Sequence, residues 1–247
     1  MKIALIGDVH GNLPALEAVY SHLKAQEVNA IWNLGDFVGY GAFPDEVVKK
    51  IRQIEAVSIL GNYDRKVLKF AEKGDDWASG KNPKKLLAFK WAYDHLSHES
   101  RVYLGSLPEQ RLVNIDGLSI LLTHGSPIDR NEHLGPGTPI ARLRGLTHTT
   151  RAKLILCAHS HQPFKRQVDD VWFINPGSVG RADDGDPRAS YAILSIFSDP
   201  PEVTHFRVAY DIERAVHALQ AAQLPVEFSQ MARLGRSLDW VMTQNHE

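Results

Sequence analysis

Residues 4–12 read ALIGDVHGN, a short apolar run that ends in two polar side chains, Asp8 and His10. Such an apolar run is typical of a buried β-strand. The segment that follows, NLPALEAVYSHLKAQ, places Leu16 and Leu23 on one face of a helix. A buried strand that leads through polar residues into a helix is typical of α/β proteins, in which ligands bind at the carboxyl ends of the strands.

The same rhythm continues after this first strand and helix. The sequence predicts a strand at residues 30–34 (AIWNL), a helix at 44–54 (PDEVVKKIRQI) and a strand at 56–60 (AVSIL). Strands that alternate with helices indicate a largely parallel start to a sheet. From about 65 to about 109 the pattern turns helical and polar, which predicts a helical insertion.

The second half of the chain is richer in predicted strands. The segment QRLVNIDGLSILLTHG predicts a β-hairpin, because Asp116 and Gly117 separate two alternating or apolar runs. Further strands are predicted around the runs AKLILCA, WFINPGS, SYAILSIF and EVTHFRVAY. Residues 127–150 look less regular, and the tail from Asp211 has the pattern of a helix.

The composition is that of an ordinary globular chain of 247 residues, 43% hydrophobic and 23% charged. It predicts one domain over 1–247, with the helical insertion at about 65–109 and a helical tail at about 211–247. The 28 basic and 29 acidic residues give a net charge of −1, so we expect neither a membrane nor duplex nucleic acid as a partner. A single cysteine, Cys157, and the lack of a signal-peptide-like or membrane-spanning apolar run favour a cytoplasmic protein.

Polar side chains follow six of the predicted strands, at the point where each strand ends. Taken singly, such a residue is more often a cap or a turn residue than a ligand. Six strand ends in order point to a common crevice at the carboxyl edge of the sheet. The residues are Asp8 and His10, Asp36, Asn62 and Asp64, His124, His159 and His161, and Asn175.

Two of these aspartates, one asparagine and four histidines supply oxygen and imidazole ligands without a thiolate. This set suits Mn, Fe or Zn rather than a structural zinc site. Seven ligands are too many for one ion, and they form two sites if Asp36 bridges. Two ions about 3.5–4 Å apart are suited to in-line displacement at phosphorus. The sequence therefore favours chemistry on a phosphate.

The series GDVH, GD, GNYD, THG, AHSH and NPGS, between residues 7 and 178, resembles the calcineurin-like metallophosphoesterase superfamily, specifically its small bacterial and archaeal phosphodiesterase-like branch. The resemblance implies an α/β fold: a four-layer αββα sandwich with two mixed β-sheets and a dinuclear metal site at the carboxyl ends of strands. It implies two divalent transition-metal ions, Mn, Fe, Zn or Ni, and the hydrolysis of phosphodiester or small phosphomonoester bonds by a hydroxide that bridges them. The implied ligands are Asp8, His10 and His161 for the first ion, Asn62, His124 and His159 for the second, and Asp36 between the two.

One motif departs from the family pattern, because GNYD has Tyr63 where the most active members of the family have a histidine. Tyr63 can donate a hydrogen bond, but a phenol with a pKa near ~10 is a poor acid, so it either assists catalysis or only lines the cleft. Asp64, which would orient that histidine, either belongs to the site or caps the following helix. The candidate catalytic residues are Asp36, Asn62, Tyr63, Asp64 and His124, and the histidines that could replace the missing one are His95, His98, His133 and His148.

Two further motifs concern the substrate. GDFVGYG lacks the arginine that phosphoprotein phosphatases carry after the valine, which favours phosphodiesters or small phosphomonoesters over phosphoproteins. In NPGSVGR, the amides around Gly177 and Ser178 could bind an anion, together with Arg181 and the amide of Asn62. The alternative for NPGSVGR is a simple turn with a solvated arginine.

Two functions follow from these observations. The first is a metallophosphoesterase that acts on a small phosphoester, nucleotides included, without a covalent intermediate. The second is a catalytically weak, metal-binding scaffold of the same fold. The complete ligand set favours the enzyme, because a scaffold has no physical need of a cluster of charged ligands.

Overall fold

The computed structural model describes residues 1–196 and 201–244, and two five-stranded sheets form its centre. The first sheet has the order β10-β9-β1-β2-β3 and the second β4-β5-β6-β8-β7. In the first, β1 to β3 are parallel, β9 is antiparallel to β1 and β10 is antiparallel to β9. The strands of the first sheet are β1 (Lys2–Ile6), β2 (Ala30–Asn33), β3 (Val57–Ser58), β9 (Ala189–Ser195) and β10 (Glu202–Val208). The predicted parallel start is confirmed.

The second sheet is mixed as well. Strands β5, β6 and β8 are parallel, and the edge strands β4 and β7 run antiparallel to their neighbours. Its strands are β4 (Gln110–Ile115), β5 (Leu118–Thr123), β6 (Leu154–Leu156), β7 (Phe164–Val168) and β8 (Val171–Asn175). The predicted hairpin is confirmed, with Asp116 and Gly117 in left-handed conformations (φ 51° and 85°) between β4 and β5.

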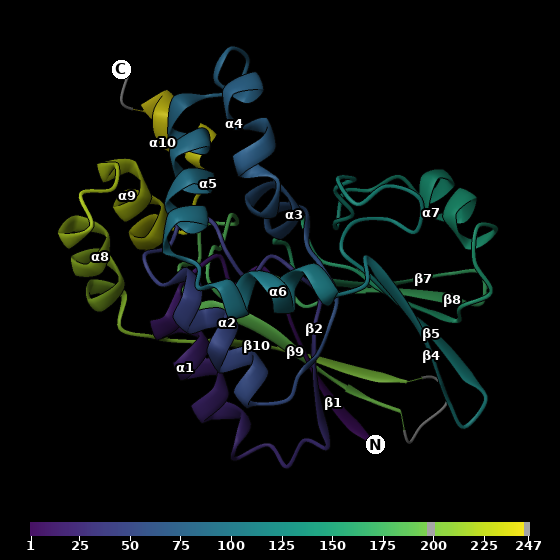
Figure 1. Cartoon of the computed structure of the whole chain (residues 1–247). Coiled ribbons are helices and arrows are strands. Elements are labelled where there is room, and N and C mark those ends of the chain that lie inside the picture. The colour runs from purple at the N-terminus through teal and green to yellow at the C-terminus, as the bar shows by residue number, and fades with distance from the viewer. Residues whose placement is uncertain (197–200, 245–247) are drawn as a thin grey trace.

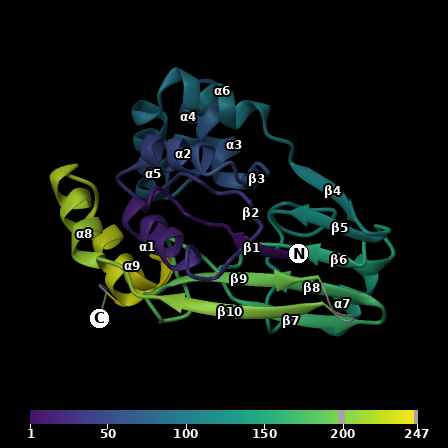
Figure 2. The same ribbon diagram turned by 90° about the horizontal axis from the view of Figure 1, so that it is seen from below.

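The two sheets pack against each other, so the centre of the molecule is a double layer of strands (Figure 2). In β1, Ile3 and Leu5 lie in the apolar cluster between the sheets, together with Leu122 and Leu156 of the second sheet. Ala4 and Ile6, which alternate with them along the strand, belong to the cluster on the opposite face. This alternation follows from the two-residue period of a strand and gives each sheet two buried faces.

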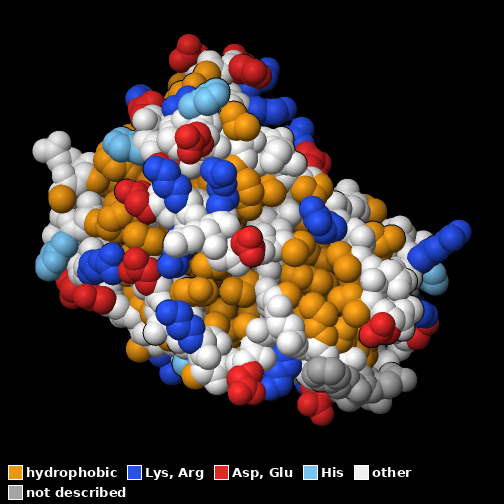
Figure 3. Space-filling model, turned by 60° about the horizontal axis from the view of Figure 1, so that its bottom comes forward, with side chains coloured by type: hydrophobic (Ala, Val, Ile, Leu, Met, Phe, Trp, Pro, Cys, Tyr) orange, Lys and Arg blue, Asp and Glu red, His pale blue; other side chains and the backbone are white. Residues whose placement is uncertain are grey.

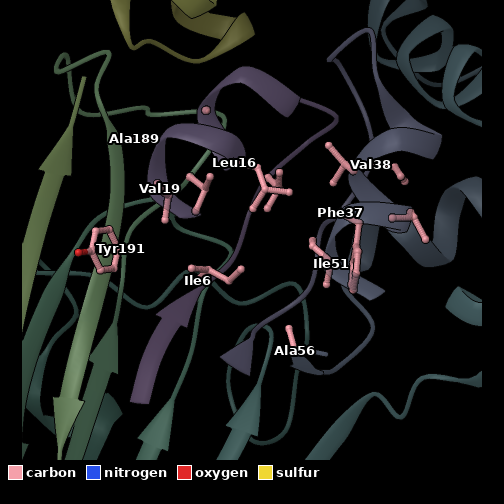
Figure 4. Packing of buried hydrophobic residues seen from close by; sticks show 14 of the residues in the cluster. Ile6, Leu16, Val19, Phe37, Val38, Ile51, Ala56, Ala189 and Tyr191 are labelled. Carbon is pink, nitrogen blue, oxygen red and sulfur yellow. The ribbon is translucent and has the colours of Figure 1, made fainter. Parts of the chain in front are cut away.

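Helices α1 (Leu13–Leu23) and α2 (Pro44–Gln53) cover the outer face of the first sheet (Figure 4). Leu16 and Val19 of α1 and Ile51 of α2 belong to the same buried cluster as Ile6 and Tyr191 of the sheet. The spacing of these apolar residues matches one helical face, as the sequence predicts.

Helix α7 (Ile140–Thr147) belongs to the outer face of the second sheet, where Leu143 and Leu146 pack with Ile155 and Phe173. The layers therefore run helix, sheet, sheet, helix, which confirms the four-layer αββα sandwich. The prediction that residues 127–150 are irregular is wrong for α7. This short helix contains Gly145, which weakens its local signal, and its packing on the sheet stabilises it.

The segment predicted as a helical insertion forms helices above the first sheet (Figure 1). They are α3 (Asn62–Leu68), α4 (Phe70–Ala78), α5 (Pro83–His95) and α6 (His98–Ser106). The first helix begins at Asn62 rather than at residue 65. The reason is local: the carboxylate of Asp64 accepts a hydrogen bond from the backbone nitrogen of Gly61 at 2.9 Å and closes the first turn.

Helices α8 (Ile212–Ala221), α9 (Val226–Leu234) and α10 (Leu238–Gln244) follow β10, as the predicted tail requires; residues 245–247 of that prediction lie outside the described residues. Phe228, Met231 and Leu238 pack in one cluster with Tyr40 and Ala88. Helix α10 therefore lies beside α5 (Figure 1).

The face shown in Figure 3 carries basic and acidic side chains in alternation, with apolar patches between them. This mixture agrees with the near-zero net charge of the chain. Within the described ranges 1–196 and 201–244, no helix has both the length and the hydropathy needed to cross a bilayer.

Candidate metal centre

The loops that follow the strands of both sheets meet at one edge of the sandwich, and hydrogen bonds join them. The carboxylate of Asp8, which follows β1, accepts a hydrogen bond from the backbone nitrogen of His159, which follows β6, at 3.0 Å. The backbone of Asp8 donates to the carbonyl of Gly35 at 2.9 Å and accepts from Gly180 at 3.0 Å. The site is therefore built from both sheets at once.

Five of the candidate ligands have a left-handed backbone, which residues other than glycine adopt rarely. Each such conformation costs on the order of 1–3 kcal/mol and persists where the surroundings impose it, typically at functional sites. The residues are Asp8 (φ 51°), His10 (49°), Asp36 (55°), His159 (66°) and His161 (58°). Five such residues in three loops support a binding site at this edge of the sandwich.

Asp8, His10 and His161 form the first of two groups of ligand atoms, and all three are buried. Oδ1 of Asp8 lies 3.4 Å from Nε2 of His161 and 3.9 Å from Nε2 of His10. The two Nε2 atoms are 3.2 Å apart. One carboxylate and two imidazoles at these distances can hold one divalent ion.

Asp36, His124 and His159 form the second group. Oδ2 of Asp36 lies 3.4 Å from Nε2 of His124, and the rings of His124 and His159 have centroids 5.1 Å apart. The amide oxygen of Asn62 lies 3.2 Å from Nε2 of His124, so Asn62 joins this group. The structure thus brings together all seven residues that the sequence predicts as ligands.

Asp36, a member of the second group, also lies close to the first. Its Oδ2 is 3.7 Å from Nε2 of His10 and 3.4 Å from Nε2 of His124, while its Oδ1 accepts a hydrogen bond from the backbone of Tyr63 at 2.7 Å. Among the described residues, neither Oδ2 of Asp36 nor Oδ1 of Asp8 has a hydrogen-bond partner, and both atoms are buried. A buried, unpartnered carboxylate oxygen is costly unless a cation meets it, so this donor set fits two metal ions.

Hydrogen bonds to the backbone orient two of the histidines. Nδ1 of His124 lies 2.8 Å from the carbonyl oxygen of Leu34, and Nε2 of His159 lies 3.0 Å from that of Asn131. Donation to these carbonyls leaves the other ring nitrogen free to bind a metal. Asn131 was not foreseen from the sequence; it lies six residues after the THG motif, in the segment expected to be irregular.

Asp183 is a second residue that sequence analysis missed. Its Oδ2 lies 3.2 Å from Nδ1 of His161 and 3.2 Å from the guanidinium of Arg181. A carboxylate in this position fixes the ring of a metal-binding histidine. In the sequence, Asp183 belongs to the run RADDGD, whose composition is typical of a solvated turn, so only its three-dimensional position reveals this contact.

The pKa values of the histidines reflect the buried carboxylates. Burial lowers the pKa of His10 and of His159 to about 3. Burial also opposes charge on His124 and His161, but the adjacent carboxylates outweigh it and raise the pKa of both to about 9. The centre therefore attracts positive charge, which divalent ions would supply.

Asp64 lies behind Asp36 and is fully buried. Of the two roles expected for it, the structure shows the capping contact at the start of α3. Burial and the nearby charge of Asp36 raise the pKa of Asp64 to about 7. The residue supports the loop that carries Asp36 and does not line the cavity described below.

Tyr63 lines the cavity with its ring edge against the ring of His10, at 5.1 Å between centroids. Its hydroxyl lies 2.8 Å from that of Tyr40. Burial and this neighbour raise the pKa of Tyr63 well above its ordinary value. The phenol is therefore a hydrogen-bond donor at neutral pH and a weak proton source.

In the NPGS turn, the amide of Gly177 and the hydroxyl of Ser178 have partners within the protein. The amide of Gly177 donates to Asn175 at 2.8 Å. The hydroxyl of Ser178 donates to the carbonyl of Asp8 at 2.7 Å and accepts from the amide of Arg181 at 2.8 Å. The hydroxyl of Ser178 thus holds the Asp8 loop in place, and phosphate binding by Gly177 and Ser178 stays a prediction. Arg181 itself lines the cavity.

Of the four histidines considered as replacements for the missing one, His133 lines the cavity. Its ring lies 4.2 Å from that of His159, between centroids. His95 lies on α5, His98 begins α6 and His148 follows α7; within the described residues, none of these three is part of the cavity lining.

A cavity of about 430 Å³ opens over the two ligand groups. Asp36, His159 and His161 contribute to its lining, with Tyr63 from α3 and Leu238 from α10. A small molecule in this cavity would have direct access to ions held by both groups.

Comparison with known proteins identifies the family. A model of the calcineurin-like phosphoesterase superfamily domain matches residues 1–199. The chain belongs to this superfamily. The resemblance drawn from the motifs is confirmed.

Two curated relatives and one solved structure illustrate the relationship. The chain is 33% identical over 251 residues to the uncharacterized protein MJ0912 of Methanocaldococcus jannaschii, which covers 95% of this chain and 98% of the relative. It is 25% identical over 179 residues to the phosphodiesterase MJ0936 of the same organism, covering 72% and 83%. The crystal structure of a metallophosphoesterase from Sphaerobacter thermophilus has 31% identity and a TM-score of 0.79, over 95% of this chain and 100% of that one.

Proposed function

We propose that this member of the calcineurin-like phosphoesterase superfamily is a metal-dependent hydrolase of phosphodiester or small phosphomonoester bonds. The observation that carries the proposal is the position of Asp36. Its buried Oδ2 has no hydrogen-bond partner among the described residues and lies 3.7 Å from Nε2 of His10 and 3.4 Å from Nε2 of His124, under an open cavity. The relative MJ0936 is named a phosphodiesterase, which supports a diester as the substrate.

Two divalent transition-metal ions, from among Mn, Fe, Zn and Ni, are the proposed cofactors. Bound in pairs, such ions polarise phosphoryl oxygens and lower the pKa of water so that it can attack phosphorus. Asp8, His10 and His161 would hold the first ion, Asn62, His124 and His159 the second, and Asp36 both.

The protein's own residues have separate tasks in this proposal. The guanidinium of Arg181 and the amide of Asn62 orient the phosphate, because both line the cavity. The hydroxyl of Tyr63 donates a hydrogen bond and does not transfer its proton, since its pKa is high. The ring of His133, beside His159, is the candidate donor of a proton to the leaving oxygen.

The domain organisation is part of the same proposal. We assign residues 1–247 to a single metallophosphoesterase domain with a helical insertion at about 65–109 and a helical tail at about 211–247. The family match at 1–199 supports the treatment of the tail as an addition to the common fold. The substrate is a small phosphoester, nucleotides included, and the unpaired thiol of Cys157, buried in the described part of the chain, supports a cytoplasmic location.

The test compares bis-p-nitrophenyl phosphate with p-nitrophenyl phosphate in metal-stripped protein to which Mn, Zn or Ni is returned. We expect metal-dependent turnover with a preference for the diester, lost in Asp36→Asn and kept in the matched surface variant Asp94→Asn. Protein that binds two ions and hydrolyses neither compound would favour the scaffold over the enzyme.

A further inference from the structure

One wall of the cavity carries three lysines, all from the helical segment between β3 and β4. Lys66 lies on α3, Lys81 precedes α5 and Lys85 lies in the first turn of α5. None of the three belongs to the ligand groups. Their task is therefore not explained by metal binding.

Two of these lysines have no acidic partner. Nζ of Lys85 lies 2.7 Å from Oδ2 of Asp239, on α10. Within residues 1–196 and 201–244, Lys66 and Lys81 have no carboxylate within 4.0 Å. The fourth cation of the lining, Arg181, is already paired with Asp183.

The unpaired ammonium groups are held in place by aromatic rings. Nζ of Lys66 lies 5.1 Å from the centre of the Tyr63 ring and 5.8 Å from that of Phe89, and Nζ of Lys81 lies 5.3 Å from the Trp77 ring. Such contacts are worth about 0.5–1 kcal/mol at exposed sites and rather more where water is excluded. The rings therefore orient the charges without neutralising them.

The lysines are also close enough to repel one another. Burial lowers the pKa of Lys66, and the charges of Lys81 and Lys85 lower it further, while Asp36 acts in the opposite direction. A half-buried group of like charges is unfavourable unless an anion joins it. The wall is thus short of negative charge.

The wall lies near the metal centre. The Tyr63 ring that meets Lys66 also meets His10 of the first ligand group, with 5.1 Å between ring centroids. One aromatic ring thus contacts both the lysine wall and the ligand groups. An anion on the wall and a phosphoester on the ligand groups can then belong to one small molecule.

We propose that Lys66 and Lys81 form a subsite for a second phosphate of the substrate, so that the enzyme acts on phosphoesters that carry two phosphates. This inference rests on the proposed function. A lysine ammonium is a point charge with three donors, and a phosphate offers three acceptor oxygens. A simple diester carries one negative charge, which would lie at the ligand groups. Such a substrate would leave Lys66 and Lys81 without an anionic partner.

The test is a binding measurement by isothermal titration calorimetry with the Mn-loaded protein. The probes are adenosine 5′-monophosphate, adenosine 5′-diphosphate and adenosine 3′,5′-bisphosphate, which share one nucleoside and differ in the presence and place of the second phosphate. We expect at least one doubly phosphorylated probe to bind about tenfold more tightly than the monophosphate. The comparison of the diphosphate with the 3′,5′-bisphosphate distinguishes a second phosphate next to the first from a distant one.

Three paired variants decide where that preference comes from. Lys66→Gln/Lys81→Gln should abolish it, Lys66→Arg/Lys81→Arg should retain it because the charge is kept, and Lys69→Gln/Lys90→Gln, outside the cavity, should leave it unchanged. Equal binding of all three probes to the wild type, or a preference that survives the first pair, overturns the subsite. Melting curves of each variant establish that the protein is folded.

The binding result and the proposed function fail separately. A lysine-dependent preference in protein that hydrolyses no phosphoester would retain the subsite and overturn the phosphoesterase. Turnover of bis-p-nitrophenyl phosphate without any preference among the adenosine phosphates would do the reverse.

Discussion

The carboxylate of Asp64 accepts a hydrogen bond from the backbone nitrogen of Asp36 at 2.9 Å. The same carboxylate accepts from the backbone of Phe37 at 2.9 Å, Val38 at 3.2 Å and Gly61 at 2.9 Å. One buried side chain thus holds the loop after β2 and the start of α3. The direction in which Asp36 points depends on it.

We predict that Asp64→Asn destabilises the protein by about 1–3 kcal/mol, because the new amide group faces backbone donors in a buried place. The turnover of bis-p-nitrophenyl phosphate should also fall, since Asp36 loses its support. Urea denaturation and steady-state kinetics measure the two effects. Asp116→Asn, at the exposed hairpin turn, is the control, and a wild-type stability for Asp64→Asn would contradict the assignment.

We predict that Asp183→Asn weakens metal binding by about 10–100-fold, because His161 loses the carboxylate that orients its ring. The loss should appear in a competition titration with a chelating dye, and activity should return at higher metal concentration. Asp184→Asn changes the neighbouring residue, which pairs with Arg207 instead. Equal metal affinity in the two variants would show that Asp183 has no role in the centre.

We predict that His133→Gln lowers kcat by about 100-fold for substrates with an alkoxide leaving group, and much less for p-nitrophenyl esters, which need no proton. The comparison uses a methyl and a p-nitrophenyl ester of the same phosphate. His148→Gln, after α7, is the control variant. Equal losses for both esters would mean that His133 shapes the cavity rather than donates a proton.

We predict an acid-sensitive contact at Asp45, on α2. Oδ1 of Asp45 accepts from the backbone and the hydroxyl of Ser97 at 3.0 and 2.7 Å, and its Oδ2 lies 2.8 Å from Nζ of Lys49. Although its partial burial acts in the opposite direction, these donors hold the pKa of Asp45 well below its ordinary value. The contact therefore contributes stability above pH ~4 and loses it as the pH falls below that value.

The measurement is the free energy of unfolding in urea at pH 6 and at pH 3. Asp45→Asn should cost about 1 kcal/mol at pH 6 and less at pH 3, so the variant has the flatter pH dependence. Asp116→Asn again serves as the control. If the stability of Asp45→Asn and of the wild type changed with pH in parallel, Asp45 would not be the source of the acid sensitivity.

The ligands were predictable because each lies where a predicted strand ends. Asp8, Asp36, His124 and His159 follow short apolar runs, and the parallel topology brings those ends to one edge. Short apolar runs likewise predicted the strands of the first sheet, and apolar residues at helical spacing predicted the helices that cover it.

Contacts that depend on folding in three dimensions were not predictable in the same way. Asp183 contacts His161 from a different loop, and the carboxylate of Asp64 accepts hydrogen bonds from backbone amides. No sequence pattern shows either contact. In the NPGS turn, likewise, the sequence does not show that the side chain of Asn175 accepts the amide of Gly177. Helix α7 is stabilised by its packing on the second sheet. The sequence of this short segment, which contains Gly145, has only a weak helical pattern.

Both ligand groups draw residues from both sheets, with Asp8 and Asp36 after strands of one and His124, His159 and His161 after strands of the other. Neither half of the sandwich contains a complete group. Release of bound metal ions would therefore coincide with the separation of the two sheets during unfolding. A stopped-flow chelator signal could follow that one event, separately from the loss of helix.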